Sequence, residues 1–392
     1  MTVETMRTVD RIVGVPLCWL TGIGARLLTR SPLRKDPSQY RTVLVIKMFG
    51  MGSVLLAAPF LEELHKRLPG ARILFLTFAS NKELVERLTV VTDPIVIRTS
   101  HFRCFLSDLV RTLAFIRRSH PDAAFDLEFF SKFTTLVSTL SGAPCRSAYE
   151  LPARWRRWNA THTVPLDISR HISLTFMDQL PWRTAVRVAD DRVHFTPSNT
   201  EIAEVIARLS LNGATPFAIA CININAGPTA LERRWPPERF AKVAERYLEK
   251  YPETTLYFTG VSSEREYIDD LLERFPQVRK RARNVAGNLS FGEFGALLSL
   301  SRWFLSNDSG PIHVASAVGT PVIALFGPES PAIYGPLANG QVLYAGTPCS
   351  PCLNVYSAKR VDCPFNAYCM REISVDQVLS EVFKQEQFHL AG

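Results

Sequence analysis

The chain has 392 residues, of which 46% are hydrophobic and 21% charged, and its net charge is +8. This composition excludes a disordered chain, and the length exceeds one typical core, so we expect two domains. The positive charge favours anionic partners, such as a nucleotide diphosphate, acidic lipid headgroups or nucleic acid, and does not choose among them. No stretch has the length and apolarity of a membrane span and no signal peptide is recognisable, so we expect a cytoplasmic protein with reduced cysteines.

The first 40 residues form a segment of their own. Residues 9–28 are apolar around much of a helical circumference, and basic residues such as Arg26, Arg30 and Arg34 follow. A helix of this kind can lie in the membrane interface, with its basic residues on anionic headgroups. It can equally dock on the core of the protein, because the same composition serves both purposes.

Residues 41–200 predict an N-terminal domain with a parallel sheet. A buried strand over 41–47 is followed by a turn containing Gly50, Gly52 and Ser53, by a helix over 54–68 and by a second strand over 72–78. This order is that of a βαβ unit. The turn precedes a helix N-terminus and is therefore suited to an anion, although two glycines alone do not identify a phosphate site.

Two acidic residues stand on a later predicted strand over 122–130. Asp126 and Glu128 occupy alternate positions, so both should point to one side of the strand. Four flanking apolar residues, three of them phenylalanines, argue against a solvent-exposed edge. Residues 145–200 are rich in arginine and tryptophan and could form an acceptor-facing surface or a solvated connection, and we expect 184–216 to link the domains.

In residues 201–375 the alternation of strands and helices begins again, which predicts a second domain. A strand over 217–224 leads into a turn at Asn225 and a basic loop with Arg233 and Arg234. Arginines beside a strand end can neutralise a diphosphate, because the guanidinium group binds phosphate oxygens in pairs. The next strand ends in Gly260, and Glu264 follows it.

The stretch 303–336 contains the most informative motif. A short strand ends in Asn307-Asp308-Ser309-Gly310, and a helix that contains His313 begins there. Free amides at a helix N-terminus can hold a phosphate, and a glycine lets it approach the backbone closely. A second strand over 322–326 also ends in a polar loop, so two loops lie side by side where doubly wound sheets bind ligands. An isolated Asp-Ser-Gly would indicate only a helix cap.

Four cysteines near the end of the chain have the spacing C-x2-C-x10-C-x5-C. They are Cys349, Cys352, Cys363 and Cys369. Four thiolates can form a closed tetrahedral site for a structural zinc or iron. The alternative is a set of reduced thiols without a metal. Residues 376–392 predict a C-terminal helix and tail.

Together these motifs resemble glycosyltransferase family 9, which includes the heptosyltransferases of lipopolysaccharide assembly. The sequence NDSGPIHVASAVGTPVIALFGP resembles the nucleotide-sugar-binding segment of the family, and RRWPPERF resembles its phosphate-binding loop. The resemblance extends from about residue 41 to 382. It implies the GT-B architecture, in which two Rossmann-like domains with parallel sheets face each other across a cleft. It also implies inverting, metal-independent transfer of a heptose from an ADP-activated donor to a lipopolysaccharide-type or other cell-surface saccharide or glycolipid at the inner membrane surface.

The resemblance also assigns roles to individual residues. The expected donor-binding residues are Gly50, Gly52, Asn225, Arg233, Arg234, Gly260, Glu264, Asp308, Ser309, Gly310 and His313. Ser53 stands where the family carries the aspartate that is taken as catalytic base. We expect Glu128 to replace it, because Glu128 stands in place of a family glutamine near the end of a strand that should lie beside this loop, and burial among phenylalanines would make it a stronger base. Asp126 matches an acid that the family already has.

Two other functions stay open. The cysteines resemble an iron-binding feature of autotransporter heptosyltransferases, which suggests a protein-modifying heptosyltransferase of the same fold. Ser53 suggests a non-catalytic protein that binds sugar nucleotides. We expect no nucleic-acid partner, no cofactor in catalysis, and at most a structural zinc or iron.

Overall fold

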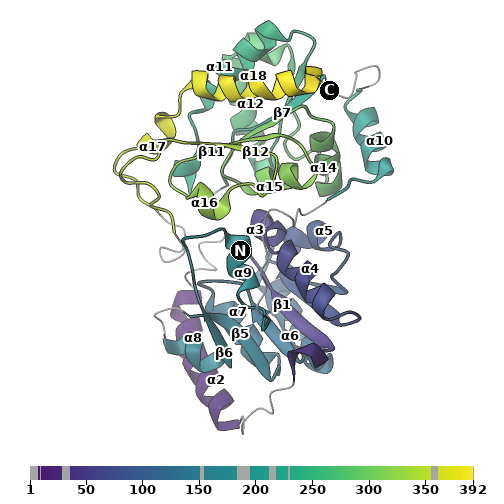
Figure 1. Ribbon diagram of the computed structural model, residues 1–392, viewed down its shortest axis with the longest axis vertical. Helices are drawn as coiled ribbons and strands as arrows, with labels where there is room; N and C mark the ends of the chain where they lie inside the picture. Colours follow the sequence, from purple (N-terminus) through teal and green to yellow (C-terminus); the bar gives the residue numbers. More distant parts are fainter. Residues whose placement is uncertain are drawn as a thin grey trace. The chain divides into compact units, whose positions relative to one another are not determined.

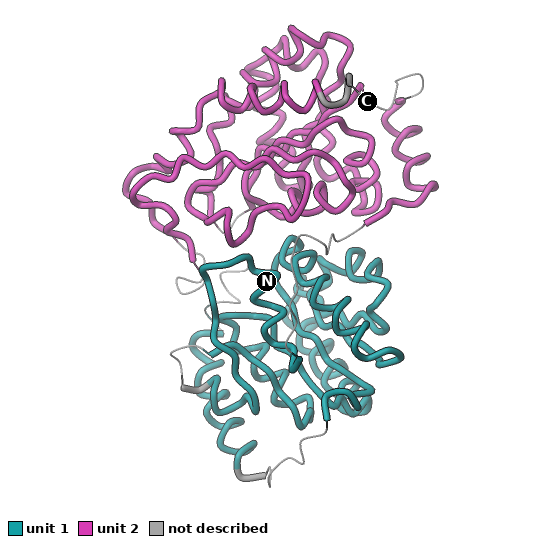
Figure 2. Tube along the Cα trace, in the orientation of Figure 1, with its two compact units in different colours: residues 1–188 teal, residues 189–392 magenta. Residues whose placement is uncertain are grey.

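The computed structural model describes residues 8, 10–28, 36–150, 154–182, 195–211, 218–227, 230–354 and 361–391. The chain forms two compact units, Met1–Val188 and Ala189–Gly392 (Figure 2). Of the segment predicted to link the domains, only 195–211 lies within the described residues, and it contains a helix. Arg30 and Arg34 of the N-terminal segment lie outside them.

Unit 1 is built on a six-stranded parallel sheet with the order β3-β2-β1-β4-β5-β6 (Figure 1). Its strands are β1 (Thr42–Ile46), β2 (Arg72–Phe78), β3 (Asp93–Ile97), β4 (Ala123–Asp126), β5 (Cys145–Glu150) and β6 (His162–Pro165). Its α-helices are α2 (Gly14–Leu28), α3 (Met51–Leu55), α4 (Ala58–Arg67), α5 (Lys82–Val85), α6 (Phe102–Arg118), α7 (Lys132–Leu140), α8 (Arg154–Asn159) and α9 (Ile172–Met177).

Both faces of this sheet are covered, which explains its continuously apolar strands. Leu44 and Ile46 of β1 belong to a buried cluster with Ile116 of α6 and Val137 of α7. On β4, Phe125 packs edge-on against Phe60 of α4, with the ring centroids 5.4 Å apart. Helices α6 and α7 therefore cover one face and α4 lies on the other.

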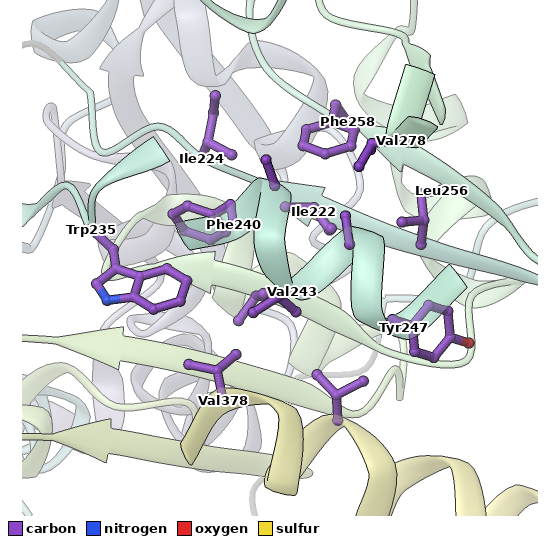
Figure 3. Close-up of a cluster of buried hydrophobic side chains, with 14 of the residues drawn as sticks. Ile222, Ile224, Trp235, Phe240, Val243, Tyr247, Leu256, Phe258, Val278 and Val378 are labelled. Carbon is purple, nitrogen blue, oxygen red and sulfur yellow. The ribbon is translucent and has the colours of Figure 1, made fainter. Parts of the chain in front are cut away.

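Unit 2 repeats this architecture with the strand order β12-β11-β10-β7-β8-β9. Its strands are β7 (Ile219–Asn223), β8 (Thr255–Phe258), β9 (Ala282–Asn284), β10 (Phe304–Asn307), β11 (Val322–Phe326) and β12 (Gly340–Tyr344). Its α-helices are α10 (Asn199–Arg208), α11 (Pro237–Lys250), α12 (Arg265–Arg274), α13 (Pro276–Arg279), α14 (Phe291–Ser299), α15 (Gly310–Ala317), α16 (Pro331–Tyr334), α17 (Tyr368–Arg371) and α18 (Val375–Ala391). Trp235, Phe240 and Val243 pack with the sheet and with Val378 of α18 in a fully buried core (Figure 3).

The predicted fold class is confirmed, since each unit is a doubly wound domain around a parallel sheet. Two predicted elements differ from those in the structure. The strand predicted over 122–130 ends at Asp126, because the Asp126 carboxylate accepts a hydrogen bond from the amide of Glu128 (3.1 Å) and turns the chain. The helix predicted over 54–68 is two helices, and the second, α4, carries a proline in its first turn. Within the described residues, no helix is long and apolar enough to cross a membrane.

Candidate active site

Asn307, the last residue of β10, joins three segments at the carboxyl edge of the second sheet. Its Oδ1 accepts a hydrogen bond from the amide of Trp235 (2.9 Å), and its Nδ2 donates to the carbonyl of Ile224 (3.0 Å). The side chain is fully buried, so water does not compete for these bonds. Asn307 therefore holds the loop after β7 and the basic loop next to the Asp308-Ser309-Gly310 turn.

Arg233 is fixed within this edge rather than free in solvent. Its Nη1 lies 3.4 Å from Oδ2 of Asp308, and its Nη2 donates to the carbonyl of Ala226 (2.6 Å). The side chain is 15% exposed. A guanidinium held in this way is preorganised to bind an anion.

The start of α15 lies directly after Asp308. Ser309 precedes the helix in an extended conformation, and its hydroxyl lies 3.1 Å from that of Ser306; it does not cap the helix in the part of the chain that the structure describes. The first amides of α15 can therefore donate to a ligand phosphate. His313, one turn further along the helix, is buried.

A second group of predicted residues meets around Gly260, just beyond β8. A Cβ atom at Gly260 would lie 2.9 Å from Nδ2 of Asn225 and 2.9 Å from Oε2 of Glu264, so only glycine allows this approach. Glu264 also accepts a hydrogen bond from the amide of Val261 (2.9 Å). Asn225 is 2% exposed, and neither polar atom of its side chain has a partner among the described residues. A buried amide without a partner is costly, and its two polar atoms can still form hydrogen bonds.

Arg234 has a different environment from Arg233. Its guanidinium lies over the ring of Tyr267, 4.8 Å from the centroid. The burial of Tyr267 raises the pKa of its phenol, and Arg234 opposes the rise. Of the two predicted arginines, only Arg233 is thus bound to the Asp308 turn.

In unit 1, Glu128 organises the loop that follows β1. Its Oε1 accepts hydrogen bonds from Nζ of Lys47 (2.7 Å) and from the amides of Met48 and Phe49 (both 2.9 Å), and the side chain is 1% exposed. The prediction that the loop after β1 lies near the segment with Glu128 is therefore confirmed. The sequence pattern does not single out Lys47 as the partner of Glu128. The signal that could have found it is a basic residue at the end of a strand.

The predicted glycines of this loop frame Ser53. Gly50 has φ = 80°, a conformation that favours glycine, and Gly52 is buried in the short helix α3. Ser53 belongs to the same helix and is half-buried. The loop thus places backbone and a hydroxyl at this edge, and Glu128 binds two amides of the same loop.

Asp126 is a structural residue in this arrangement. It is fully buried, pairs with Nη2 of Arg156 (2.8 Å) and accepts hydrogen bonds from the hydroxyls of Thr134 (3.1 Å) and Thr135 (3.3 Å). Burial raises the pKa of Asp126, and Arg156 opposes this rise. The donors around Asp126 hold the β4 turn against α7 and α8.

The four cysteines lie in a segment that packs on the loop after β11. The amides of Cys352 and Leu353 donate to the carbonyl of Pro328 (2.9 and 2.7 Å), and a Cβ at Gly327 would lie 3.0 Å from Sγ of Cys369. Burial raises the pKa of the Cys369 thiol to about 11. In the described part of the chain, no group of three or more His, Cys, Asp or Glu side chains is placed to hold a metal ion. The arrangement therefore does not fit the zinc or iron site that the spacing suggested.

Solved structures share this two-unit fold. One is the structure of E. coli ADP-heptose lps heptosyltransferase II, with 19% identity over 88% of this chain and 98% of that chain and a TM-score of 0.68. Another is the glycosyl transferase family 9 protein from Veillonella parvula DSM 2008, with 23% identity over 90% and 99% of the two chains and a TM-score of 0.70. The two doubly wound units therefore have the fold of GT-B glycosyltransferases.

Sequence comparisons show similarity to one family. The profile of glycosyltransferase family 9 (heptosyltransferase) matches residues 192–360. Lipopolysaccharide heptosyltransferase 2 of Escherichia coli (strain K12) is 25% identical over 305 residues, which cover 76% of this chain and 86% of that protein. The chain is therefore similar to the heptosyltransferases of glycosyltransferase family 9.

Proposed function

We propose that this enzyme transfers a heptose from ADP-heptose to a lipopolysaccharide-type saccharide acceptor, with inversion at the transferred carbon. The observation that carries the proposal is the fixed pair of Arg233 and Asp308 at the start of α15, in a chain whose relatives are named lipopolysaccharide heptosyltransferases. The protein-modifying alternative has less support, because the described cysteines do not form the metal site that suggested it.

The donor would bind to unit 2. Arg233 and the first amides of α15, with Gly310 at the start of the helix, would hold the diphosphate, and Asp308 would keep Arg233 in place. The unpartnered Asn225 amide and the Glu264 carboxylate suit hydroxyl groups of a ribose or sugar. The leaving diphosphate needs no metal in this scheme, because guanidinium and amide donors stabilise its charge.

We assign the acceptor to unit 1 and the role of catalytic base to Glu128. Transfer requires a group that takes the proton of the acceptor hydroxyl, and the Ser53 hydroxyl is not basic unless another group activates it. Oε1 of Glu128 is held by Lys47 and two amides, whereas Oε2 has no hydrogen bond to the residues that the structure describes. Oε2 is therefore the atom that would accept the proton.

We also propose that the enzyme works as a peripheral protein on the inner face of the cytoplasmic membrane. Helix α2 buries its small residues Gly14, Cys18 and Gly22, whereas Leu20 is 66% exposed and Ile23 43% exposed. The two interpretations of the N-terminal segment are thus compatible: one side of the helix docks on unit 1, and the other presents large apolar side chains that suit a bilayer interface.

Calorimetry with nucleotides and nucleotide sugars tests the donor assignment. ADP or ADP-heptose should bind more tightly than the UDP and GDP equivalents, and Asp308→Ala or Arg233→Ala should weaken binding by roughly 1.5–3 kcal/mol, because a charge-assisted contact is lost. Arg246→Ala, which removes an exposed arginine on α11, is the matched control and should bind normally. Unchanged affinity in both site variants would remove the assignment.

A further inference from the structure

Helix α6 carries large apolar side chains on the side that faces away from the core. Phe102, Leu106 and Val110 are spaced four residues apart and are 61%, 49% and 60% exposed. The opposite side of the helix packs against the rest of unit 1, since Thr112 and Ile116 are buried. A surface helix normally has one apolar side and one polar side, so the second apolar stripe requires its own explanation.

The charged residues around this stripe are almost all basic. Arg103, Arg111 and Arg118 are exposed on α6, next to or beyond the apolar stripe. Asp108 is the one acidic residue of the helix, and it is bound to Arg98 through two hydrogen bonds of 2.8 Å each. The outward side of α6 therefore combines apolar side chains with uncompensated positive charge.

Helix α6 and helix α2 are linked through α7. Phe105 of α6 packs against Phe133 of α7 with the ring centroids 5.5 Å apart, and α7 in turn contacts α2. The contact between α2 and α7 is close, because a Cβ at Gly14 would lie only 2.7 Å from Cβ of Lys132. Both helices thus contact α7.

We propose that the outer surface of α2 and α6 is a single docking surface for an anionic phospholipid bilayer. This α2–α6 surface consists of Leu17, Leu20, Ile23, Phe102, Leu106 and Val110 with their neighbouring arginines. The proposal rests on the proposed function, to which it adds a second contact helix. Charge complementarity favours a bilayer, because apolar side chains enter the headgroup region while arginines bind acidic headgroups.

Vesicle sedimentation with the full-length protein tests this surface. Wild-type protein should bind vesicles of phosphatidylglycerol and phosphatidylethanolamine, and bind vesicles of phosphatidylcholine much more weakly. Leu106→Gln/Val110→Gln should lower the partition coefficient by about tenfold or more, because two apolar side chains that would enter the bilayer are lost. Arg103→Gln/Arg111→Gln should also lower it by about tenfold, and high salt should remove this second difference.

The controls separate this proposal from the donor assignment. Phe365→Gln changes a side chain of unit 2 that is 57% exposed, and should bind vesicles normally. All variants should keep wild-type melting temperatures and bind ADP normally. The proposal is wrong if the α6 variants bind vesicles like the wild type, or if light scattering shows a dimer that the α6 variants lose, in which case a second copy covers the stripe. If the wild-type protein does not bind ADP, the proposed function is contradicted instead.

Discussion

Glu128 is where the catalytic proposal can be tested at the scale of one residue. If Glu128 is the base, Glu128→Gln should reduce transfer by roughly 10²–10⁴-fold and leave donor affinity unchanged. The amide oxygen of glutamine can still accept hydrogen bonds from Met48 and Phe49, so the loop should be retained. Turnover measured from released ADP, with donor affinity from calorimetry, gives both quantities.

Lys47 supplies the control for this experiment, because Glu128→Gln leaves its ammonium group without a charged partner. Lys47→Met/Glu128→Gln removes both charges. Under the base assignment the double variant should be as inactive as the single one, and Ser53→Ala should be much milder. If the double variant regains near-normal turnover, Glu128 only positions the loop and another group takes the proton.

The residues of the proposed donor site could be selected from the sequence, but the side chains and backbone groups that they contact could not. Polar residues at strand ends identify Asp308, Arg233 and Asn225, because parallel strands bring those ends to one edge. The bonds of Asn307 and the Lys47–Glu128 pair depend on the tertiary positions of residues about 80 apart in sequence. No local pattern specifies such pairs.

At the scale of the elements, one buried carboxylate attaches α18 to the rest of unit 2. Glu386 accepts hydrogen bonds from the Tyr247 hydroxyl (2.5 Å) and Trp303 Nε1 (3.0 Å), and pairs with Arg302 (2.9 Å). Glu386→Gln should lower the free energy of unfolding by roughly 3 kcal/mol, because an arginine loses its partner and an amide group faces buried donors. Denaturant unfolding followed by tryptophan fluorescence measures the change.

Glu381 is the matched control on the same helix. It pairs with Lys384, which is exposed, so Glu381→Gln should change stability little. Equal destabilisation by the two substitutions would show that helix charge, and not the buried network, stabilises α18.

Asp108 gives a prediction about pH at the start of α6. Its hydrogen bonds with Arg98 lower the pKa of the carboxyl to about 2, below its ordinary value of 3.8. Folding therefore favours the ionised carboxyl. The ion pair stabilises the folded state at pH values above the ordinary pKa, and this stabilisation is lost as the pH falls towards 2. Asp108→Asn should lower the melting temperature slightly near neutral pH, because Arg98 is exposed, and the difference should vanish near pH 2. A constant difference across this range would contradict the pairing.

The elements themselves were predictable where hydrophobic pattern and turn residues agreed. The strand predicted over 122–130 was too long, because the apolar pattern continues past the point where the Asp126 side chain turns the backbone. Periodicity reports which side chains are buried, and it does not distinguish a buried strand from a buried loop.

At the scale of the whole molecule, the alternation of strands and helices is enough to predict two doubly wound units. The N-terminal segment and the cysteines were ambiguous for a physical reason: each composition is compatible with two structures. An apolar helix with glycines can dock or bind a bilayer, and four thiols can bind a metal or remain reduced. The structure shows that the small residues of α2 dock on unit 1, and it gives no metal site among the described cysteines.

The most direct test of the proposed function is a transfer reaction with ADP-heptose and a defined lipopolysaccharide acceptor that lacks the outer heptose. We expect release of ADP and an acceptor whose mass, measured by mass spectrometry, increases by one heptose residue. Arg233→Ala should reduce both signals together. If the protein binds ADP-heptose but neither releases ADP nor modifies any acceptor, it is a sugar-nucleotide-binding protein and the assignment of transferase activity is wrong.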